Sequence, residues 1–414
     1  FTRKFGPAQS GGDFKRRTFE PQNLGDYVAS VMNRCIVCKR CIRTCDEVVG
    51  EKALGVFDRG GRSFISTVDE QPLACVQCGN CIEVCPVGAL LPKPERFTYR
   101  PWQVETTTST CAFCPVGCAV SVWDKEGWPV RVNSGEPAGG AEWLCVKGRF
   151  GYGLVQRPER LSRPLVRKDG ELVMASWDEA LARAAEILKA GASSTQVLGG
   201  SHLTLEECLV LKNLACEVLK TPHLDSRTDR VWAGAASPLL QAAGNLEAMG
   251  KVSWLDAKAA LVVGLDPKHE APVIGMVLRQ RAYARQTQVA VLAERTTIVH
   301  EVASVKETVG PGELKARLAR LAEALENGNP DPVGDLLLKG ERVVLVAGRR
   351  LGYGGASELA RIYRLLASKG VTVGLAVTGG RSGSLGALAC GILPGQGGRV
   401  LLRRRLVDLR GLIG

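Results

Sequence analysis

Two cysteine runs of identical spacing constrain this chain more than any other feature. Each run has the spacing C-x2-C-x2-C-x3-C, and the eight residues are Cys35, Cys38, Cys41, Cys45, Cys75, Cys78, Cys81 and Cys85. Three thiolates packed this closely can surround one metal cluster, whereas the fourth lies on the following helical turn and faces away. The two runs therefore have to fold against each other, because each one completes the ligand set of the other.

Two [4Fe–4S] clusters with crossed ligands, as in two-cluster ferredoxins, best explain this spacing. The first site is assigned to Cys35, Cys38, Cys41 and Cys85. The second site is assigned to Cys75, Cys78, Cys81 and Cys45. A pair of zinc sites is the alternative, but zinc takes four ligands, usually as two C-x2-4-C pairs, so the third cysteine of each run would be surplus.

A third cysteine motif follows with the spacing C-x2-C-x3-C-x26-C. This third site consists of Cys111, Cys114, Cys118 and Cys145. Alternating apolar residues at 119–123 and 129–132 predict a hairpin that returns Cys145 to the other three cysteines. Four thiolates suffice for a third [4Fe–4S] cluster, although a zinc site stays open, because thiolate number and spacing do not exclude it.

Basic residues flank two of the three sites. They are Lys39, Arg40 and Arg43 at the first site, and Lys147 and Arg149 at the third. Cations close to a cluster would favour its reduced, more negative state. The alternative is that they are exposed docking charges, which solvent and salt screen.

Composition limits the remaining classes of function. Twelve of the 15 cysteines have metal-type spacings, which favours a reducing compartment. The sequence has no apolar run of about 18 residues, so no transmembrane helix is expected. The net charge of +12 is compatible with nucleic acid, anionic lipid or acidic protein partners. We favour subunit docking and expect no nucleic-acid binding, because basic and aromatic residues do not interleave as in known nucleic-acid modules.

The order of motifs predicts several domains. We expect a lead-in over residues 1–30, an α+β ferredoxin-like two-cluster module over 31–100, and a small β-rich [4Fe–4S] domain over 101–165. Two short strands at 54–57 and 62–65 are expected between the cysteine runs. An α/β domain with a mostly parallel sheet is predicted over 166–414.

Buried strands alternating with helices indicate this parallel sheet. The strand-like runs are 196–198, 260–263, 289–292, 343–346 and 371–376, and amphipathic helices are predicted at 271–285, 313–326 and 356–368. Capping boxes at Ser176–Glu179 and Thr204–Glu207 predict the starts of two more helices. Gly264, Gly348 and Gly379 follow strand ends, but they form no phosphate-binding fingerprint, so we interpret them as plain turns.

The remaining cysteines and the histidines indicate no further site. Cys208 and Cys216 are eight residues apart on one helix and, like Cys390, are expected to pack in the core. The four histidines, which have no metal-like partner at i+3 or i+4, are His202, His223, His269 and His300. The sequence contains no nucleophile or proton-transfer constellation, so the simplest function is a path for electrons.

The motif order also carries a resemblance to a known family. The segments that follow the third site begin at Lys147-Gly-Arg-Phe-Gly-Tyr, Pro158-Glu-Arg-Leu and Ser176-Trp-Asp-Glu-Ala. Together with the cysteine motifs, they resemble the large iron–sulfur subunit of bacterial complex I, the NADH–quinone oxidoreductase. The sequence also resembles the alpha subunit of molybdenum formate dehydrogenases, to which that large subunit is related.

The resemblance implies a respiratory, electron-carrying role. The protein would relay electrons from a flavin/NADH subunit toward quinone, with no catalytic residue of its own. Its partners would be the other subunits, on the cytoplasmic face of the inner membrane. The alternative is the cluster-bearing part of a molybdenum or tungsten formate dehydrogenase-type oxidoreductase.

Two departures from formate dehydrogenases imply that no molybdopterin binds here. Those enzymes carry a cysteine or selenocysteine ligand, which would fall soon after Asp225, whereas residues 226–232 contain no cysteine. They also need a long C-terminal half to enclose the pterin, and this sequence stops at Gly414. The large subunit of complex I for its part has a [2Fe–2S] domain and a cluster held by one histidine and three cysteines, which are not found here. The sequence would fit either a fragment of such a subunit or a homologue with fewer domains.

Overall fold

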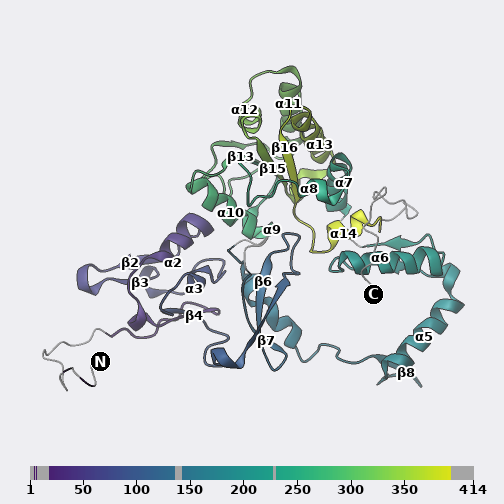
Figure 1. Cartoon of the computed structure of the whole chain (residues 1–414), viewed down its shortest axis with the longest axis horizontal. Coiled ribbons are helices and arrows are strands. Elements are labelled where there is room, and N and C mark those ends of the chain that lie inside the picture. The colour runs from purple at the N-terminus through teal and green to yellow at the C-terminus, as the bar shows by residue number, and fades with distance from the viewer. Residues whose placement is uncertain (1–3, 5, 7–17, 136–141, 227–229, 393–414) are drawn as a thin grey trace.

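The two cysteine runs fold into one module of short elements, drawn at the purple end of the colour range in Figure 1. The computed structural model describes residues 4, 6, 18–135, 142–226 and 230–392. The strands of the module are β1 (Val28–Ser30), β2 (Gly55–Phe57), β3 (Phe64–Ser66) and β4 (Leu90–Pro92). Its helices are α2 (Arg40–Arg43), the π-helical turn η2 (Thr44–Val49) and α3 (Asn80–Glu83). β1 pairs antiparallel with β4, and β2 with β3, which confirms the two strands predicted between the runs.

A three-stranded antiparallel sheet follows the module. Its strands, in order, are β5 (Glu105–Thr110), β6 (Ala119–Lys125) and β7 (Trp128–Ser134). β6 and β7 form the predicted hairpin, at whose turn the Gly127 N–H donates to the Asp124 carboxylate at 3.2 Å. The short helix α4 (Val146–Phe150) then begins directly after Cys145. This sheet lies beside the cysteine-rich module (Figure 1).

A five-stranded, wholly parallel sheet forms the core of the α/β region, in the order β14-β13-β12-β15-β16. The strands are β12 (Ala259–Val263), β13 (Gln288–Ala293), β14 (Val305–Thr308), β15 (Arg342–Ala347) and β16 (Thr372–Val377). Alternate side chains of a strand point to opposite faces, so Leu261 joins the core on one face and Val262 the core on the other. The parallel sheet is thus confirmed, and only the half-exposed edge strand β14 was not predicted.

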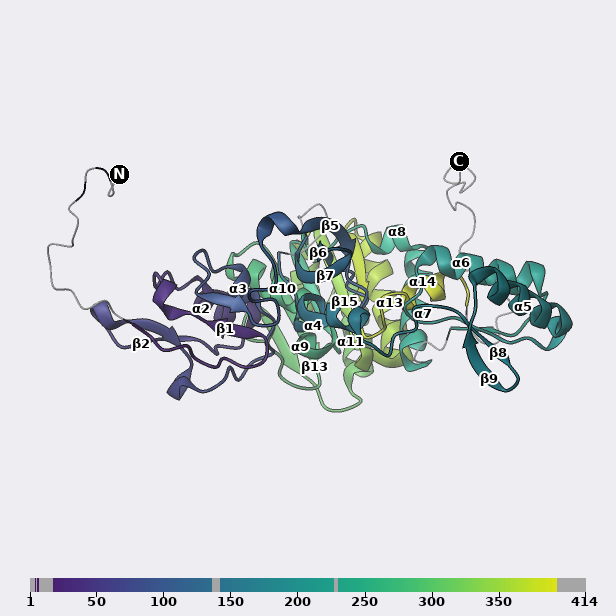
Figure 2. The ribbon, with the colours of Figure 1, turned by 90° about the horizontal axis from the view of Figure 1, so that it is seen from below.

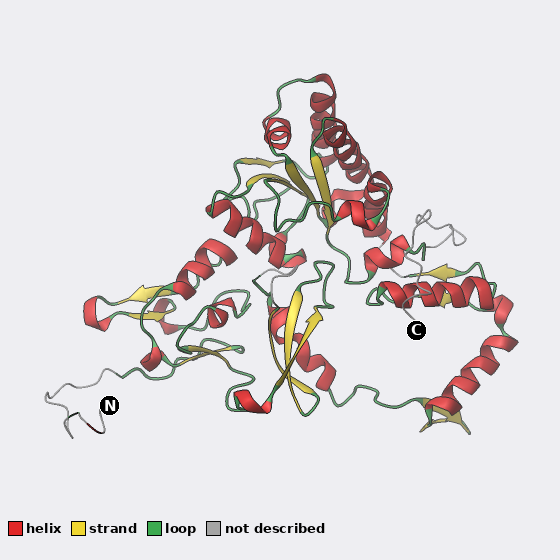
Figure 3. Ribbon diagram, in the orientation of Figure 1, coloured by secondary structure: helices red, strands yellow, loops and turns green. Residues whose placement is uncertain are grey.

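Helices cover both faces of this sheet (Figure 3). One face packs against α7 (Arg230–Ala243), α11 (Leu314–Asn327), α12 (Pro332–Lys339) and α13 (Gly352–Ser368). The other face packs against α10 (Pro272–Tyr283), which also contacts η2 of the cysteine-rich module. Shorter helices are α8 (Leu246–Met249), α9 (Pro267–Glu270) and α14 (Ser384–Ala389). α10 therefore joins the sheet to the module.

The segment between the two sheets reaches away from both (Figure 2). It contains the hairpin of β8 (Leu165–Lys168) and β9 (Glu171–Met174), followed by α5 (Trp177–Ala190) and α6 (Leu205–Asn213). Both predicted helix starts are confirmed, since Ser176 Oγ accepts the Glu179 N–H at 3.2 Å and Thr204 and Glu207 form a complete capping box. Among the helices that the structure describes, none is long and apolar enough to cross a membrane.

One predicted strand lies outside the main sheet. β10 (Val197–Leu198) pairs in parallel with β11 (Leu224–Asp225) in a sheet of two strands. The reason is that Val197 is buried in a separate core, where it packs with Cys208 and Cys390. An apolar run predicts that a strand is buried, but not against which neighbour.

The prediction for Cys216 is wrong, because its side chain is exposed while Cys208 and Cys390 are buried as expected. α6 continues into a π-helical turn, η8 (Leu214–Val218), which shifts the helix face. Ala215 is consequently turned inward and is fully buried.

The glycines after the strand ends allow two loops to pack backbone against backbone. The Gly348 N–H donates to the Val263 carbonyl at 2.9 Å. A Cβ atom at Gly348 would overlap the backbone of Gly264 and Leu265. Gly264 itself has a φ of 56°, which favours glycine. These contacts support the interpretation of the glycines as turns.

Candidate metal centre

Both cysteine runs use the same backbone geometry to direct their sulfur atoms. Val37 and Gln77, each two residues after the first cysteine of its run, have φ angles of 55° and 48°. This left-handed conformation turns the chain back, so that the Val37 N–H donates to Cys35 Sγ and the Gln77 N–H to Cys75 Sγ, both at 3.3 Å. Such N–H donors stabilise negative charge on sulfur, as cluster ligands require.

The thiols of the two runs gather in crossed sets. One pocket is lined by Cys35, Cys38, Cys41 and Cys85. A neighbouring pocket is lined by Cys45, Cys75, Cys78 and Cys81. These sets are the first and the second site as assigned from the sequence. That the pockets bind clusters stays a prediction.

The third site is built where β5 ends and β6 begins. The Cys111 N–H donates to the Cys118 carbonyl at 2.8 Å, which closes the loop that carries Cys114. Cys145 approaches from the N-terminus of α4, where Gly148 lies so close that a Cβ atom would be 3.6 Å from Cys111 Sγ. Burial raises the pKa of Cys118, and the other three thiols of the site raise it further. The predicted four cysteines are thus brought together.

The donor sets fit [4Fe–4S] clusters, which bind one thiolate at each of four irons. Burial raises the pKa of Cys41 and of Cys78 to about 12, so these thiols stay protonated unless a metal replaces the proton. In the described part of the chain, no three His, Cys, Asp or Glu side chains are placed to hold a single metal ion.

The first site lies at the surface of the molecule. Cys38 is exposed, and so are Lys39, Arg40 and Arg43 around it. Arg43 forms an exposed ion pair with Glu47 at 2.8 Å. For these basic residues the structure therefore favours the docking interpretation.

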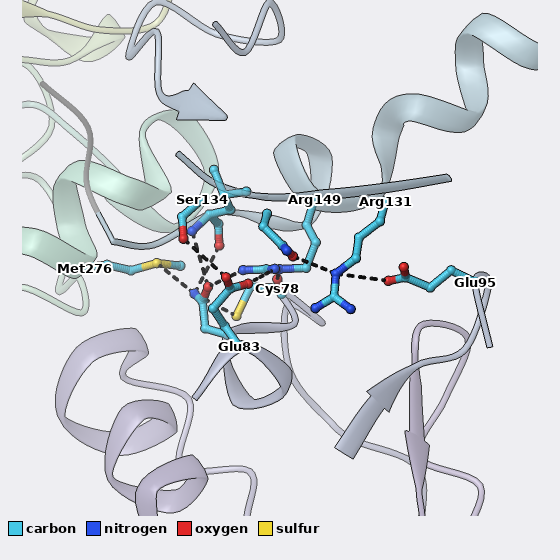
Figure 4. A network of polar contacts seen from close by, with 10 residues as sticks. Cys78, Glu83, Glu95, Arg131, Ser134, Arg149 and Met276 are labelled. Carbon is cyan, nitrogen blue, oxygen red and sulfur yellow. Dashed lines mark hydrogen bonds and ion pairs between the residues drawn. The ribbon is translucent and has the colours of Figure 1, made fainter. Parts of the chain in front are cut away.

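Arg149 behaves differently from the basic residues at the first site. Its side chain is buried, and it contacts the second site rather than the third (Figure 4). Nε donates to the Cys78 carbonyl at 3.0 Å, Nη2 donates to Asn80 Oδ1 at 3.1 Å, and Nη1 forms an ion pair with Glu83. The sequence motifs did not indicate Asn80 or Glu83. One difference between the runs could have pointed to Asn80, because the second run has Gly79-Asn80 at the positions where the first has Lys39-Arg40.

Further polar contacts join the cysteine-rich module to the α/β region. The fully buried Arg279 of α10 donates to the Asp46 carbonyl in η2 at 2.8 Å and pairs with Glu301 at 3.1 Å. Lys268 pairs with Glu51 at 2.7 Å beside a cavity of about 310 Å³, which Cys114 and Cys145 also line. The two regions are therefore held by charged contacts close to the second and third sites.

His202 connects the third site to the α/β region. Its Nδ1 lies 3.1 Å from the Ala112 carbonyl, in the loop between two third-site cysteines, and its Nε2 lies 2.8 Å from the Arg381 guanidinium. The sequence indicated no role for His202. These contacts make it a structural link rather than a metal ligand.

Three family models match the chain in succession. The ferredoxin-like domain of NADH-quinone oxidoreductase subunit 3 matches residues 25–91, the molybdopterin oxidoreductase Fe4S4 domain matches 104–157, and molybdopterin oxidoreductase matches 160–325. Together with the fold, these matches define the class: an iron–sulfur protein that combines a ferredoxin-like module with a molybdopterin-oxidoreductase-like α/β domain.

Curated relatives narrow this class to one family. An NADH-quinone oxidoreductase subunit of Rhizobium meliloti, designated G 2, is 32% identical over 80% of this chain and 39% of its own length. NADH-quinone oxidoreductase subunit 3 of Thermus thermophilus is 39% identical over 66% of this chain and 34% of its own length. The alpha subunit of the NADPH-Fe(3+) oxidoreductase of Geobacter sulfurreducens is 32% identical over 73% of this chain and 36% of its own length. These similarities confirm the resemblance of the chain to the large iron–sulfur subunit of NADH-quinone oxidoreductase. The chain spans between 34% and 39% of the length of these three relatives.

Proposed function

We propose that this chain is the electron-transfer iron–sulfur subunit of a complex I-like NADH–quinone oxidoreductase. It would relay electrons from a flavin/NADH subunit toward quinone-linked subunits, peripherally on the cytoplasmic face of the membrane. The observation that carries the proposal is the convergence of twelve cysteines in three sets of four. Bound to these sets, three [4Fe–4S] clusters would supply one-electron transfer.

The arrangement of the sites supports a linear path. The first site has an exposed cysteine and exposed basic residues, which suit an acidic partner protein. The second site lies inside and adjoins the third, because Asn80 hydrogen-bonds both Cys78 Sγ and the Leu144 carbonyl next to Cys145. The path would thus run between a surface docking point and the interior.

The α/β domain would serve as a scaffold without molybdopterin. Residues 226–232 contain no cysteine, and the Gly264 and Gly348 loops pack on each other at the strand ends. The formate dehydrogenase-type alternative is favoured by the match of residues 160–325 to molybdopterin oxidoreductase and by the cavity beside the third site. Metal analysis separates the two functions.

Iron content tests the proposal. Three [4Fe–4S] clusters require about 12 irons per anaerobically purified chain. Cys114→Ser should remove about four of them, because Cys114 belongs to the third site. The matched control Cys216→Ser should remove none, since the Cys216 side chain is exposed and outside the three sites. A wild-type chain with about four irons would contradict the three-cluster function.

A further inference from the structure

Arg149 stands out because its position in the sequence and its position in space point to different sites. It follows the third-site ligand Cys145 by four residues, on α4, but its guanidinium lies on the second-site loop that contains Cys78 and Asn80. Its side chain is only 4% exposed. A buried guanidinium keeps its positive charge, because its pKa is too high for deprotonation in proteins.

The loop of the second site is shaped to accept this side chain. Gly79 has a φ of 74°, and a Cβ atom there would lie 2.5 Å from Arg149 Cδ. The corresponding residue of the first run is Lys39, which is exposed. The two runs have the same cysteine spacing, but Gly79 of the second run lies against the buried Arg149 side chain, whereas Lys39 of the first run is exposed. Figure 4 shows Arg149 with Cys78 and Glu83 close to it.

Asn80 extends the contact to the third site. This fully buried amide donates to Cys78 Sγ at 3.4 Å and to the Leu144 carbonyl at 3.0 Å. In return, the Leu144 N–H donates to Asn80 Oδ1 at 3.2 Å. One side chain therefore bridges a second-site cysteine and the residue before Cys145.

The electrostatic consequence follows from the burial of Arg149. Reduction adds negative charge to a cluster, and a cation in a medium of low dielectric stabilises that charge more than one in water. Net charge and hydrogen bonds to sulfur are among the quantities that set the reduction potential. The Glu83 carboxylate, which pairs with Nη1, offsets part of the positive charge.

We propose that Arg149 is a positioning residue that raises the reduction potential of the second site and, through Asn80, keeps that site in contact with the third. This inference rests on the proposed function, because it requires clusters at both sites. It assigns the buried cation of α4 to a site whose ligands lie more than 60 residues away in the sequence.

Redox titration of the anaerobically reconstituted full chain, followed by electron paramagnetic resonance, tests the inference. In Arg149→Met, which keeps side-chain volume without charge, the midpoint potential of the second site should become more negative while that of the first site is unchanged. Arg149→Lys retains the charge and should keep the second-site potential closer to that of the wild type. Arg317→Met is the control, because Arg317 is a similarly buried, ion-paired arginine in the α/β domain.

The possible outcomes separate this inference from the proposed function. Full iron content with unchanged potentials in Arg149→Met would overturn it. Equal loss of iron from all three sites would also overturn it, since Arg149 would then only stabilise the fold. Loss of iron confined to the second site would support it. A wild-type chain that lacks three cluster signals would instead defeat the proposed function itself.

Discussion

Cys45 is the residue whose replacement tests the crossed ligand sets most directly. It belongs to the first run in sequence but lines the pocket of the second site, where its Sγ accepts the Ala53 N–H at 3.4 Å. Cys45→Ala should therefore remove the electron paramagnetic resonance signal of the second site and leave that of the first. Cys85→Ala should show the reverse pattern. If Cys45→Ala abolished only the first-site signal, the crossing would be wrong.

His300 makes the stability of the α/β domain depend on pH. It is buried, its Nδ1 accepts the Thr297 N–H at 3.0 Å, and burial followed by the charge of Lys306 lowers its pKa. The unfolded chain binds a proton near the ordinary pKa of about 6.5, whereas the folded chain does not, so this contribution to stability is lost as the pH falls below about 6.5. Hydrogen exchange of β13 amides should show weaker protection at lower pH.

The control for this pH effect is a pair of variants. In His300→Gln the loss of protection between neutral and mildly acidic pH should be smaller than in the wild type. His223→Gln, at an exposed histidine, should behave as the wild type does. An equal pH dependence in all three proteins would show that His300 is not responsible.

At the scale of single elements, α6 depends on its N-terminal cap. Thr204 Oγ1 accepts the Glu207 N–H at 3.2 Å, and the Glu207 carboxylate accepts the Thr204 N–H at 2.8 Å. Thr204→Ala should lower the free energy of opening of α6 by about 1 kcal/mol, measured by native-state hydrogen exchange. Thr204→Ser keeps the hydroxyl and should change it little. No difference between the two variants would exclude a capping contribution.

The same helix shows how a local departure from regular geometry changes which residues are buried. The π-helical turn after α6 buries Ala215 and exposes Cys216. The turn packs in the core that also holds β10 and β11. Helical periodicity in the sequence assumes 3.6 residues per turn, so it assigns the wrong face wherever a π-helical turn intervenes.

At the scale of the whole molecule, α10 unites the chain. One of its faces packs on the parallel sheet, and its Arg279 contacts η2, the turn that contains Cys45. The α/β domain thereby supports the second site directly. This role as a scaffold needs no cofactor in the domain itself.

Metal analysis of the purified full chain checks the scaffold role. We expect iron but no stoichiometric molybdenum or tungsten, and no fluorescence of oxidised pterin after release from the protein. The reason is that residues 226–232 contain no cysteine, whereas the formate dehydrogenases that the sequence resembles carry a cysteine or selenocysteine ligand in that segment. Retention of a pterin with molybdenum at a ratio near one per chain would favour the formate dehydrogenase-type function.

The sequence by itself determined the three cysteine sets and most of the parallel sheet. Metal-ligand spacing is local, because residues within one or two turns have few ways to direct their sulfurs. Long apolar runs such as 259–263 likewise predict buried strands without reference to the rest of the chain. The fold class and the family resemblance could be predicted from these features.

Only the tertiary structure decided which site each charged residue serves. Arg149 follows Cys145 in sequence, yet it is buried against Cys78 and Asn80, and Asn80 in turn reaches Leu144. The edge strand β14, the separate β10–β11 pair and the exposure of Cys216 were decided in the same way. Each of these features depends on a packing partner that is distant in the sequence. A polar side chain such as that of Arg149 can be buried where partners satisfy its hydrogen bonds, and those partners need not be its neighbours in the chain.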